Sequence, residues 1–144
     1  MLRLTNLADY AVVVMATAAR HPGAKLSAAT VAATSGIPAP TVAKLMGTLA
    51  RAGLLVSHRG VAGGFGLSRA ADAISVADIV EAVDGPIAIT QCCSEGRADC
   101  GIEGSCGVRV HWTPINRAVR AALAAVPLSA LVRAQAAASR ELVA

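Results

Sequence analysis

The sequence has no long apolar run, although 55% of its 144 residues are apolar. No run reaches the roughly 18 residues of a membrane-spanning helix. The first twenty residues also lack the basic start and unbroken apolar centre of a secretory leader. We therefore expect no membrane partner and a cytoplasmic location. The length suits one compact core with an extension for oligomerisation.

Acidic residues are nearly absent from the first 70 residues, where Asp9 stands alone against seven lysines and arginines. Residues 71–106 reverse this balance with seven acids and one arginine, and residues 107–144 return to five arginines against one glutamate. The net charge of +4 therefore hides a basic block at the amino-terminal end. Such a block predicts that this part of the chain contacts nucleic acid.

The usual marks of an enzyme are also missing from the sequence. No glycine-rich nucleotide loop precedes a helix, and no paired carboxylates stand beside a candidate nucleophile. The cysteines have no histidine at a persuasive catalytic spacing. We therefore expect a binding protein and not an enzyme.

Helical periodicity dominates the first fifty residues. Apolar residues recur at helical spacing from Thr5 to Arg20, and two further helices are predicted over 28–34 and 40–51. The turn between these two contains Gly36. Two helices joined in this way have the layout of a helix-turn-helix, whose second helix enters the DNA major groove.

A β-hairpin is predicted directly after this unit. Strand-like residues 54–58 and 65–67 flank the glycine-rich turn 59–64. A helix-turn-helix followed by such a hairpin is a winged helix. The predicted fold class is therefore mainly α with a small β-wing, extended by a long C-terminal dimerisation helix.

Helical spacing returns over 76–83, over 108–126 and over 128–142. The long middle helix contains Pro114, which marks either a bend or a late start. A long helix on a small domain needs a cover, and a homodimer gives one that matches a palindromic operator. We divide the chain into a DNA-binding domain (1–84), a cysteine-rich cluster-binding loop (85–107) and a dimerisation helix with its tail (108–144).

Six residues are predicted to contact double-stranded DNA. Thr41 and Lys44 are expected on the exposed side of the recognition helix, where Lys44 can reach a guanine or a phosphate. Arg59, at the edge of the wing, is the leading candidate for a phosphate or minor-groove contact. Arg51 is either a contact or a solvated residue. The full set is Pro40, Thr41, Lys44, Arg51, Arg59 and Gly60.

All four cysteines lie between residues 92 and 106, in a stretch whose glycines and alanines predict a loop. Thiols stay reduced in the cytoplasm, so this grouping indicates metal binding or redox sensing before structural disulfides. The spacing lacks the paired knuckles of a zinc site, whereas thiolates along a flexible loop can surround an iron–sulfur cluster. The candidate ligands, with one of the adjacent pair as the ligand, are Cys92, Cys93, Cys100 and Cys106.

Zinc and a disulfide framework stay open as alternative interpretations of the cysteines. The loop joins the winged domain to the dimerisation helix, so ordering of the loop by a cluster is expected to change the separation of two recognition helices. The predicted device is a switch in which cluster state sets operator affinity.

Several stretches together resemble the Rrf-two (Rrf2) family of winged-helix regulators. They are LT at 4–5 with ADYAV at 8–12, RGVAGGF at 59–65, ISVADIV at 74–80 and the cysteine loop, and the resemblance covers about residues 1–133. MLRL at 1–4, GPIAIT at 85–90, and Trp112 followed by Ile115 and Asn116 are most similar to regulators of the SUF iron–sulfur assembly system. The resemblance implies a dimeric regulator, here expected to be a repressor of SUF genes, that carries a 2Fe-2S or 4Fe-4S cluster.

The family pattern leaves the fourth cluster ligand open. IscR-type members place a histidine where this chain has Arg109, whereas NsrR-type members use an aspartate from the other subunit where this chain has Asp9. Asp9 is therefore a candidate ligand, and His111 is a weaker one. The alternatives to the SUF role are a nitric oxide sensor of the NsrR type and a zinc or thiol-redox switch without a cluster.

Overall fold

Six α-helices and one antiparallel hairpin make up the computed structural model, which describes residues 3–94 and 100–141, and side chains as far as residue 134. In chain order the elements are α1 (Asn6–Ala19), α2 (Ala28–Ser35), α3 (Ala39–Arg51), β1 (Leu55–His58), β2 (Gly64–Leu67), α4 (Val76–Asp84), α5 (Arg109–Ala124) and α6 (Leu128–Glu141). Short 3₁₀ turns lie at η1 (Ala71–Ala73), η2 (Gln91–Cys93) and η3 (Glu103–Ser105). The predicted fold class is confirmed.

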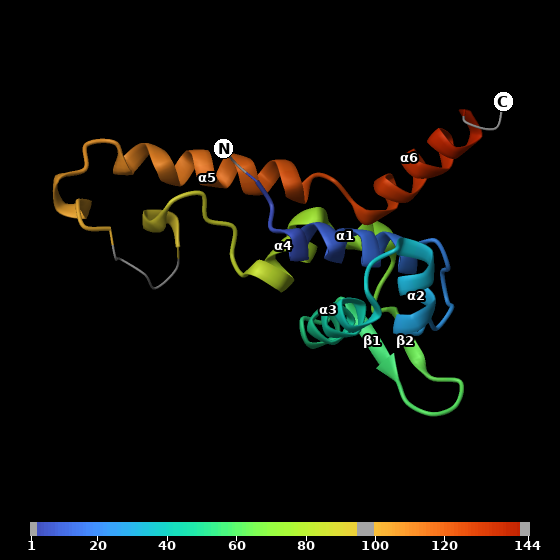
Figure 1. Ribbon diagram of the computed structural model, residues 1–144. Helices are drawn as coiled ribbons and strands as arrows, with labels where there is room; N and C mark the ends of the chain where they lie inside the picture. Colours follow the sequence, from blue (N-terminus) through green and yellow to red (C-terminus); the bar gives the residue numbers. More distant parts are fainter. Residues whose placement is uncertain (1–2, 95–99, 142–144) are drawn as a thin grey trace.

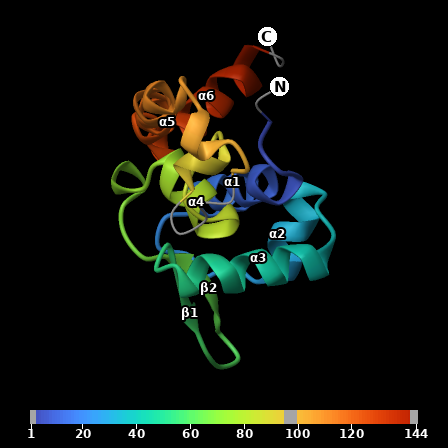
Figure 2. The ribbon, with the colours of Figure 1, turned by 90° about the vertical axis from the view of Figure 1, so that its left-hand side faces the viewer.

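The elements form three levels in space. Helices α1 and α4 lie in the middle, with α2, α3 and the hairpin below them and with α5 and α6 above (Figure 1), and the view turned by 90° agrees (Figure 2). The core lies between these levels, and its fully buried side chains include Met15, Met46, Leu49, Ile79 and, at the start of α6, Leu128. One core thus holds the winged unit, α4 and the start of α6 together.

Side-chain caps explain where the predicted helices begin. Thr5 accepts a hydrogen bond from the Ala8 N–H at the start of α1, and Ser27 does the same for α2. Ser75 and Asp78 form a reciprocal capping box at the start of α4. Burial raises the pKa of the Asp78 carboxyl, but hydrogen bonds from Ser75 and the nearby Arg69 outweigh it and hold the pKa below its ordinary value.

The hairpin is anchored to the helical body by a β-bridge from a residue outside its two strands. Strands β1 and β2 pair in the register Leu55 with Leu67 and His58 with Gly64. Leu26, just before α2, exchanges two backbone hydrogen bonds of 2.9 Å with Phe65. The base of the wing therefore moves with the helix-turn-helix, and only its tip extends beyond the body.

Helix α5 is the least embedded helix of the described chain. None of its residues is buried, and its amino-terminal half projects beyond α4, with the cysteine-bearing turns at its far end (Figure 1). Pro114 lies inside the helix, so it does not mark a late start. Among the described residues, no helix combines the length and the apolar character that a bilayer crossing requires.

Candidate DNA interface and cysteine segment

Helix α3 presents one apolar and one polar face. Its inner side buries Val42, Leu45, Met46 and Leu49 in the core. Pro40 and Lys44 are exposed and Thr41 is half-buried. Lys44 has no hydrogen-bond or ion-pair partner within the described part of the chain. Its ammonium group is therefore available to an outside anion such as a phosphate.

The wing tip is built to a tight backbone geometry. Arg59 is exposed, and Gly60 adopts a φ of +103°, which favours glycine. The Gly63 N–H donates to the Gly60 carbonyl over 2.9 Å and closes the turn. Arg59 is thus displayed on a defined turn at the outer end of the hairpin.

Arg51 lies at the end of α3 and folds back on its own helix. Its Nη2 donates to the Thr48 hydroxyl over 3.0 Å, and its guanidinium lies over Gly47. Arg51 is exposed, so this local bond is weak and leaves the guanidinium accessible to solvent.

A basic groove lies beside the wing and was missed by sequence reasoning. It has a volume of about 560 Å³, and its lining includes His21, Lys25, His58 and Arg69 but no acidic residue. These residues come from the turn after α1, from the end of β1 and from the segment before η1. The pairing of Leu26 with Phe65 brings the turn after α1 beside the hairpin. We call this the basic groove.

The four cysteines are free thiols, and each is half-buried. Cys92 and Cys93 lie in η2, where the Thr90 hydroxyl approaches their sulfur atoms to 3.2 and 3.4 Å. Cys100 and Cys106 flank η3. The predicted loop thus contains two short 3₁₀ turns, because backbone hydrogen bonds between residues three apart form around Cys92 and again around Glu103.

Arg109 occupies the position where the resemblance places a histidine ligand. Its guanidinium pairs with the Glu103 carboxylate over 2.7 Å, which ties the start of α5 to η3 beside Cys106. An arginine stays protonated and donates hydrogen bonds only, so it cannot ligate a metal. In this chain, residue 109 therefore forms an ion pair that holds η3 against the start of α5.

The donor set of residues 92–106 fits an iron–sulfur cluster in its chemistry. Thiolates are the soft ligands that such clusters require, and all four cysteines are outside any disulfide and half-buried. Within the described residues, no three cysteine, histidine or acidic side chains are gathered as a ready metal site. Asp9 is exposed in the first turn of α1, where its charge also suits the helix dipole, and His111 is exposed near the start of α5.

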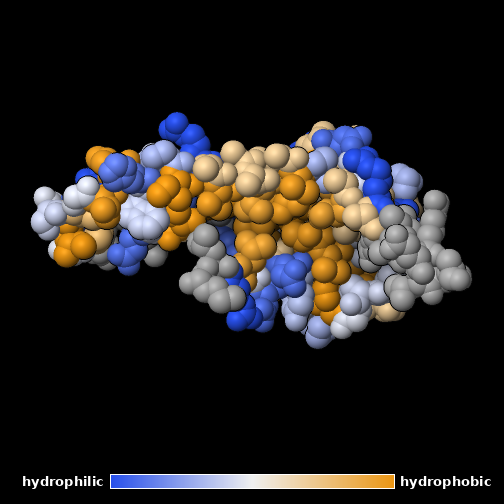
Figure 3. Space-filling model, turned by 90° about the horizontal axis from the view of Figure 1, so that it is seen from above, coloured by the Kyte–Doolittle hydropathy of each residue, from blue (hydrophilic) through white to orange (hydrophobic). Residues whose placement is uncertain are grey.

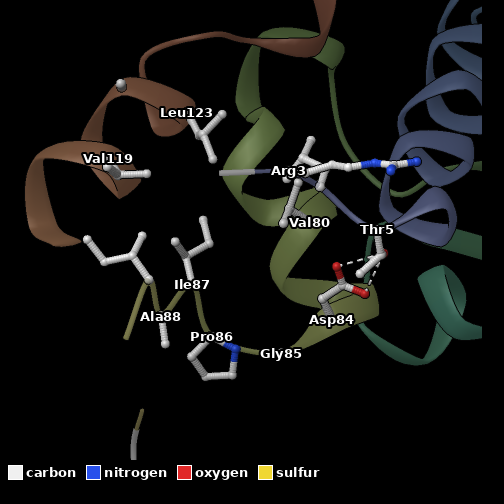
Figure 4. Close-up of a pocket in the computed structure, with 13 residues that line it drawn as sticks. Arg3, Thr5, Val80, Asp84, Gly85, Pro86, Ile87, Ala88, Val119 and Leu123 are labelled. Atoms are coloured by element: carbon white, nitrogen blue, oxygen red, sulfur yellow. Dashed lines mark hydrogen bonds between the residues drawn. The ribbon is translucent and has the colours of Figure 1, made fainter. Parts of the chain in front are cut away.

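A hollow of about 580 Å³ separates α5 from the start of α1 (Figure 4). Val80, Ile87, Val119 and Leu123 give it an apolar lining, and residues 85–89 run along one side. The Thr5 hydroxyl bonds both oxygens of Asp84 at 2.8 and 3.0 Å at its edge. The start of α1 is therefore fastened to the end of α4, where the chain leaves for the cysteines.

Two polar contacts connect α5 with the chain before the cysteines. Arg120 bonds both carboxylate oxygens of Glu81 at 2.8 Å. The Arg120 hydrogen bond lowers the pKa of the Glu81 carboxyl from its ordinary value, and the same contact raises the pKa of Arg120. Asn116, one turn earlier, bonds the backbone of Ile87 and Ile89.

Comparison with known proteins gives a consistent result. The family model Rrf2, described as an iron-dependent transcriptional regulator, matches residues 4–134. The HTH-type transcriptional regulator IscR of Erwinia tasmaniensis is 32% identical over 135 residues, which cover 93% of this chain and 81% of that protein. These similarities agree with the resemblance seen in the sequence.

Solved structures share the fold. CymR of B. subtilis, described as its global cysteine regulator, has a TM-score of 0.72 at 28% identity, covering 92% of this chain and 98% of that one. The oxidised form of Staphylococcus aureus CymR has a TM-score of 0.69 at 25% identity, covering 91% and 96%. T. potens IscR, at 23% identity over 93% and 88% of the two chains, shows the same fold with a TM-score of 0.69.

Proposed function

Since this chain belongs to the Rrf2 family of transcriptional regulators, which are DNA-binding proteins and not enzymes, we propose that it is an iron–sulfur-cluster-dependent repressor of SUF assembly genes. One observation carries this proposal. Four free thiols occupy the connection between α4 of the winged unit and α5. Any group bound there alters the segment that joins the two parts.

The proposed ligands are one of Cys92 and Cys93 together with Cys100 and Cys106, with Asp9 of a second copy as the fourth. A bound cluster would supply a redox-sensitive centre that oxidants, nitric oxide or iron shortage can remove. The described residues hold no preassembled site. Binding would therefore order the segment, and the free energy of that ordering would be available to change DNA affinity.

The proposed DNA surface combines α3, the wing and the basic groove. Lys44 lies on the exposed face of α3 and Arg59 at the wing tip, and Lys25 and Arg69 of the basic groove extend the positive surface past the wing. Pro40, Thr41, Arg51 and Gly60 complete the predicted contacts. Phosphate contacts of this kind fix the protein on the duplex, whereas base contacts from α3 select the sequence.

A homodimer is proposed because α5 has an uncovered apolar surface. Val108, Val110 and Ile115 are between 44 and 73% exposed. In the view from above, hydrophobic residues gather over the middle of the molecule and also lie among hydrophilic ones at its left end, where α5 begins (Figure 3). A two-fold partner would cover this surface and place two recognition helices on one operator, inside the cytoplasm where the DNA lies.

A thiol switch without a cluster is the second candidate. Two observations favour it, namely the absence of a gathered ligand set among the described residues and the likeness to the oxidised form of CymR. In this candidate a disulfide or another oxidised thiol replaces the cluster as the signal. The structural coupling to α4 would be the same.

Anaerobic purification separates the two candidates. The cluster hypothesis predicts brown protein with bound iron and sulfide, and loss of both in Cys100→Ala or Cys106→Ala. Arg59→Ala is expected to keep the colour and to weaken binding to a duplex that the wild-type protein has selected from random sequence. Colourless protein whose DNA affinity follows thiol oxidation would support the thiol switch, and DNA affinity that ignores both would refute both.

A further inference from the structure

The Asn116 side chain binds the chain just before the cysteines at two points. Its Oδ1 accepts the Ile89 N–H and its Nδ2 donates to the Ile87 carbonyl, both over 2.9 Å. An asparagine amide has one carbonyl and one amino group, and both are used here. We call this pair of hydrogen bonds the Asn116 clamp.

The segment held by this clamp has little other support. No residue from Gly85 to Thr90 is buried. The partly buried Ile87 packs against the small cluster of Ala8, Val76 and Val80, and an apolar hollow of about 580 Å³ lies along the rest of the segment. A segment with few buried contacts opens at low free-energy cost unless polar contacts fix it. The Asn116 clamp joins residues 87–89 to α5 by two direct hydrogen bonds, in addition to the packing of Ile87.

The cysteines follow the clamp directly. Thr90 comes one residue after the clamped Ile89, and its hydroxyl contacts the sulfur atoms of Cys92 and Cys93 at 3.2 and 3.4 Å. Only two residues separate Ile89 from Cys92, so a shift of one moves the other. The clamp thereby fixes the first two thiols relative to α5.

A second contact, between Arg120 and Glu81, joins α5 to α4 of the DNA-binding body. Arg120 lies one turn beyond Asn116 on the same helix and forms its two-point contact with Glu81 of α4. Glu81 Oε1 also accepts the Ile87 N–H, over 3.4 Å. Because α4 buries Ile79 against the winged core, a movement of residues 87–89 reaches that core through Glu81.

We propose that Asn116 is the positioning residue that transmits the state of Cys92 and Cys93, through Ile87 and the Arg120–Glu81 contact, to the DNA-binding body. This inference rests on the proposed function in that the thiols must change state in the cell. It adds the route by which that change acts, and it assigns a role to the Asn116 of the sequence motif. Asn116 itself touches neither a thiol nor DNA.

The first test measures the position of the thiols directly, without any cluster. In a Cys100→Ser, Cys106→Ser background, only Cys92 and Cys93 react with a disulfide reagent such as DTNB. Asn116→Ala should raise their labelling rate about tenfold, because two hydrogen bonds of ordinary net strength are lost. Arg117→Ala, the neighbouring exposed residue, is the matched control and should label at the wild-type rate.

The second test measures coupling in the full-cysteine protein. The affinity for the selected duplex is compared between metal-free reduced protein and protein reconstituted anaerobically with iron and sulfide. Asn116→Ala should keep the reduced-state affinity within about twofold of wild type, since the DNA surface is untouched, but bring the ratio between the two states close to one. A residue with a merely structural role would lower the unfolding temperature and leave this ratio unchanged.

Arg120→Lys tests the second contact and guards against misfolding of the first variant. Lysine keeps the charge but cannot reproduce the two-point bond to Glu81, so this variant should label at the wild-type rate and still lose the ratio. Wild-type labelling together with a wild-type ratio in Asn116→Ala would overturn the inference. If wild-type affinity itself ignores reconstitution, the cluster-dependent function fails, and an unchanged labelling rate would then refute the clamp separately.

Discussion

Replacing Gly63 by alanine is the sharpest single test of the wing. A Cβ atom at this position would lie 2.4 Å from the His58 carbonyl oxygen and 2.7 Å from that of Gly60, well inside the 3.0 Å that real Cβ atoms respect. Both neighbours are backbone atoms, so no side chain can rotate away. The turn must open to accept the methyl group, and the Gly63–Gly60 hydrogen bond is lost with it.

The expected losses of stability and of DNA affinity in Gly63→Ala differ, because the wing tip carries Arg59 but no part of the core. Opening the turn costs about 1–3 kcal/mol of local strain, but residues 59–62 are exposed and the core lies elsewhere. The global free energy of unfolding should therefore change little. Displacing Arg59 from a phosphate removes a charged contact of about 1.5–3 kcal/mol, which lowers operator affinity about 10- to 100-fold.

Fluorescence anisotropy with the selected duplex measures this loss, and thermal unfolding measures global stability. Val61→Ala is the matched control, because Val61 projects fully into solvent at the same tip and its replacement should leave both quantities unchanged. Gly63→Ala protein that binds as tightly as wild type, while Arg59→Ala is impaired, would show that tip geometry does not place Arg59.

Three further predictions follow from single contacts. The Arg120 hydrogen bond lowers the pKa of Glu81. The contact therefore stabilises the fold fully above the ordinary pKa of a glutamate, about 4.3, and this stabilisation is lost as pH falls through the lowered pKa. In urea unfolding between about pH 6 and 3, the free energy of unfolding should fall less in Glu81→Gln than in wild type, by less than about 1 kcal/mol because Arg120 is half exposed. Lys25→Ala should reduce the slope of log affinity against log salt by about 0.9 if the basic groove holds one phosphate, as titrations at several salt concentrations would show. Val110→Glu should give monomers in sedimentation, whereas Val61→Glu, at an even more exposed position on the wing, should not.

Local signals were sufficient to predict most of the helices and the hairpin. Thr5, Ser27 and Ser75 are cap residues whose bonds reach only three positions along the chain, so their effect is visible in a short window of sequence. The glycines of the wing are equally local. The first and last residues of α1 to α4 therefore agree with the predicted ones to within one or two positions.

Contacts between distant residues could not be predicted in the same way. Leu26 meets Phe65 and Asn116 meets Ile87 only after the helices have packed, and neither pair leaves a periodic signal. The basic groove and the Asn116 clamp both depend on such pairs. The sequence motif did draw attention to Asn116, but it could not show what the side chain binds.

Under the proposed function, the position of the cysteines on the fold would let one small segment affect two distant surfaces. Helix α5 has no buried residue, and its attachment to the body includes the Arg120–Glu81 contact and the Asn116 clamp, with Arg109 tying its other end to Glu103. The cysteines lie between these attachments. Stiffening this segment would therefore fix the angle of α5 on α4, whereas loosening it would free α5 without disturbing the core. In a dimer held through α5, that angle sets the distance between the two copies of α3, so a local change at the thiols becomes a change in operator spacing.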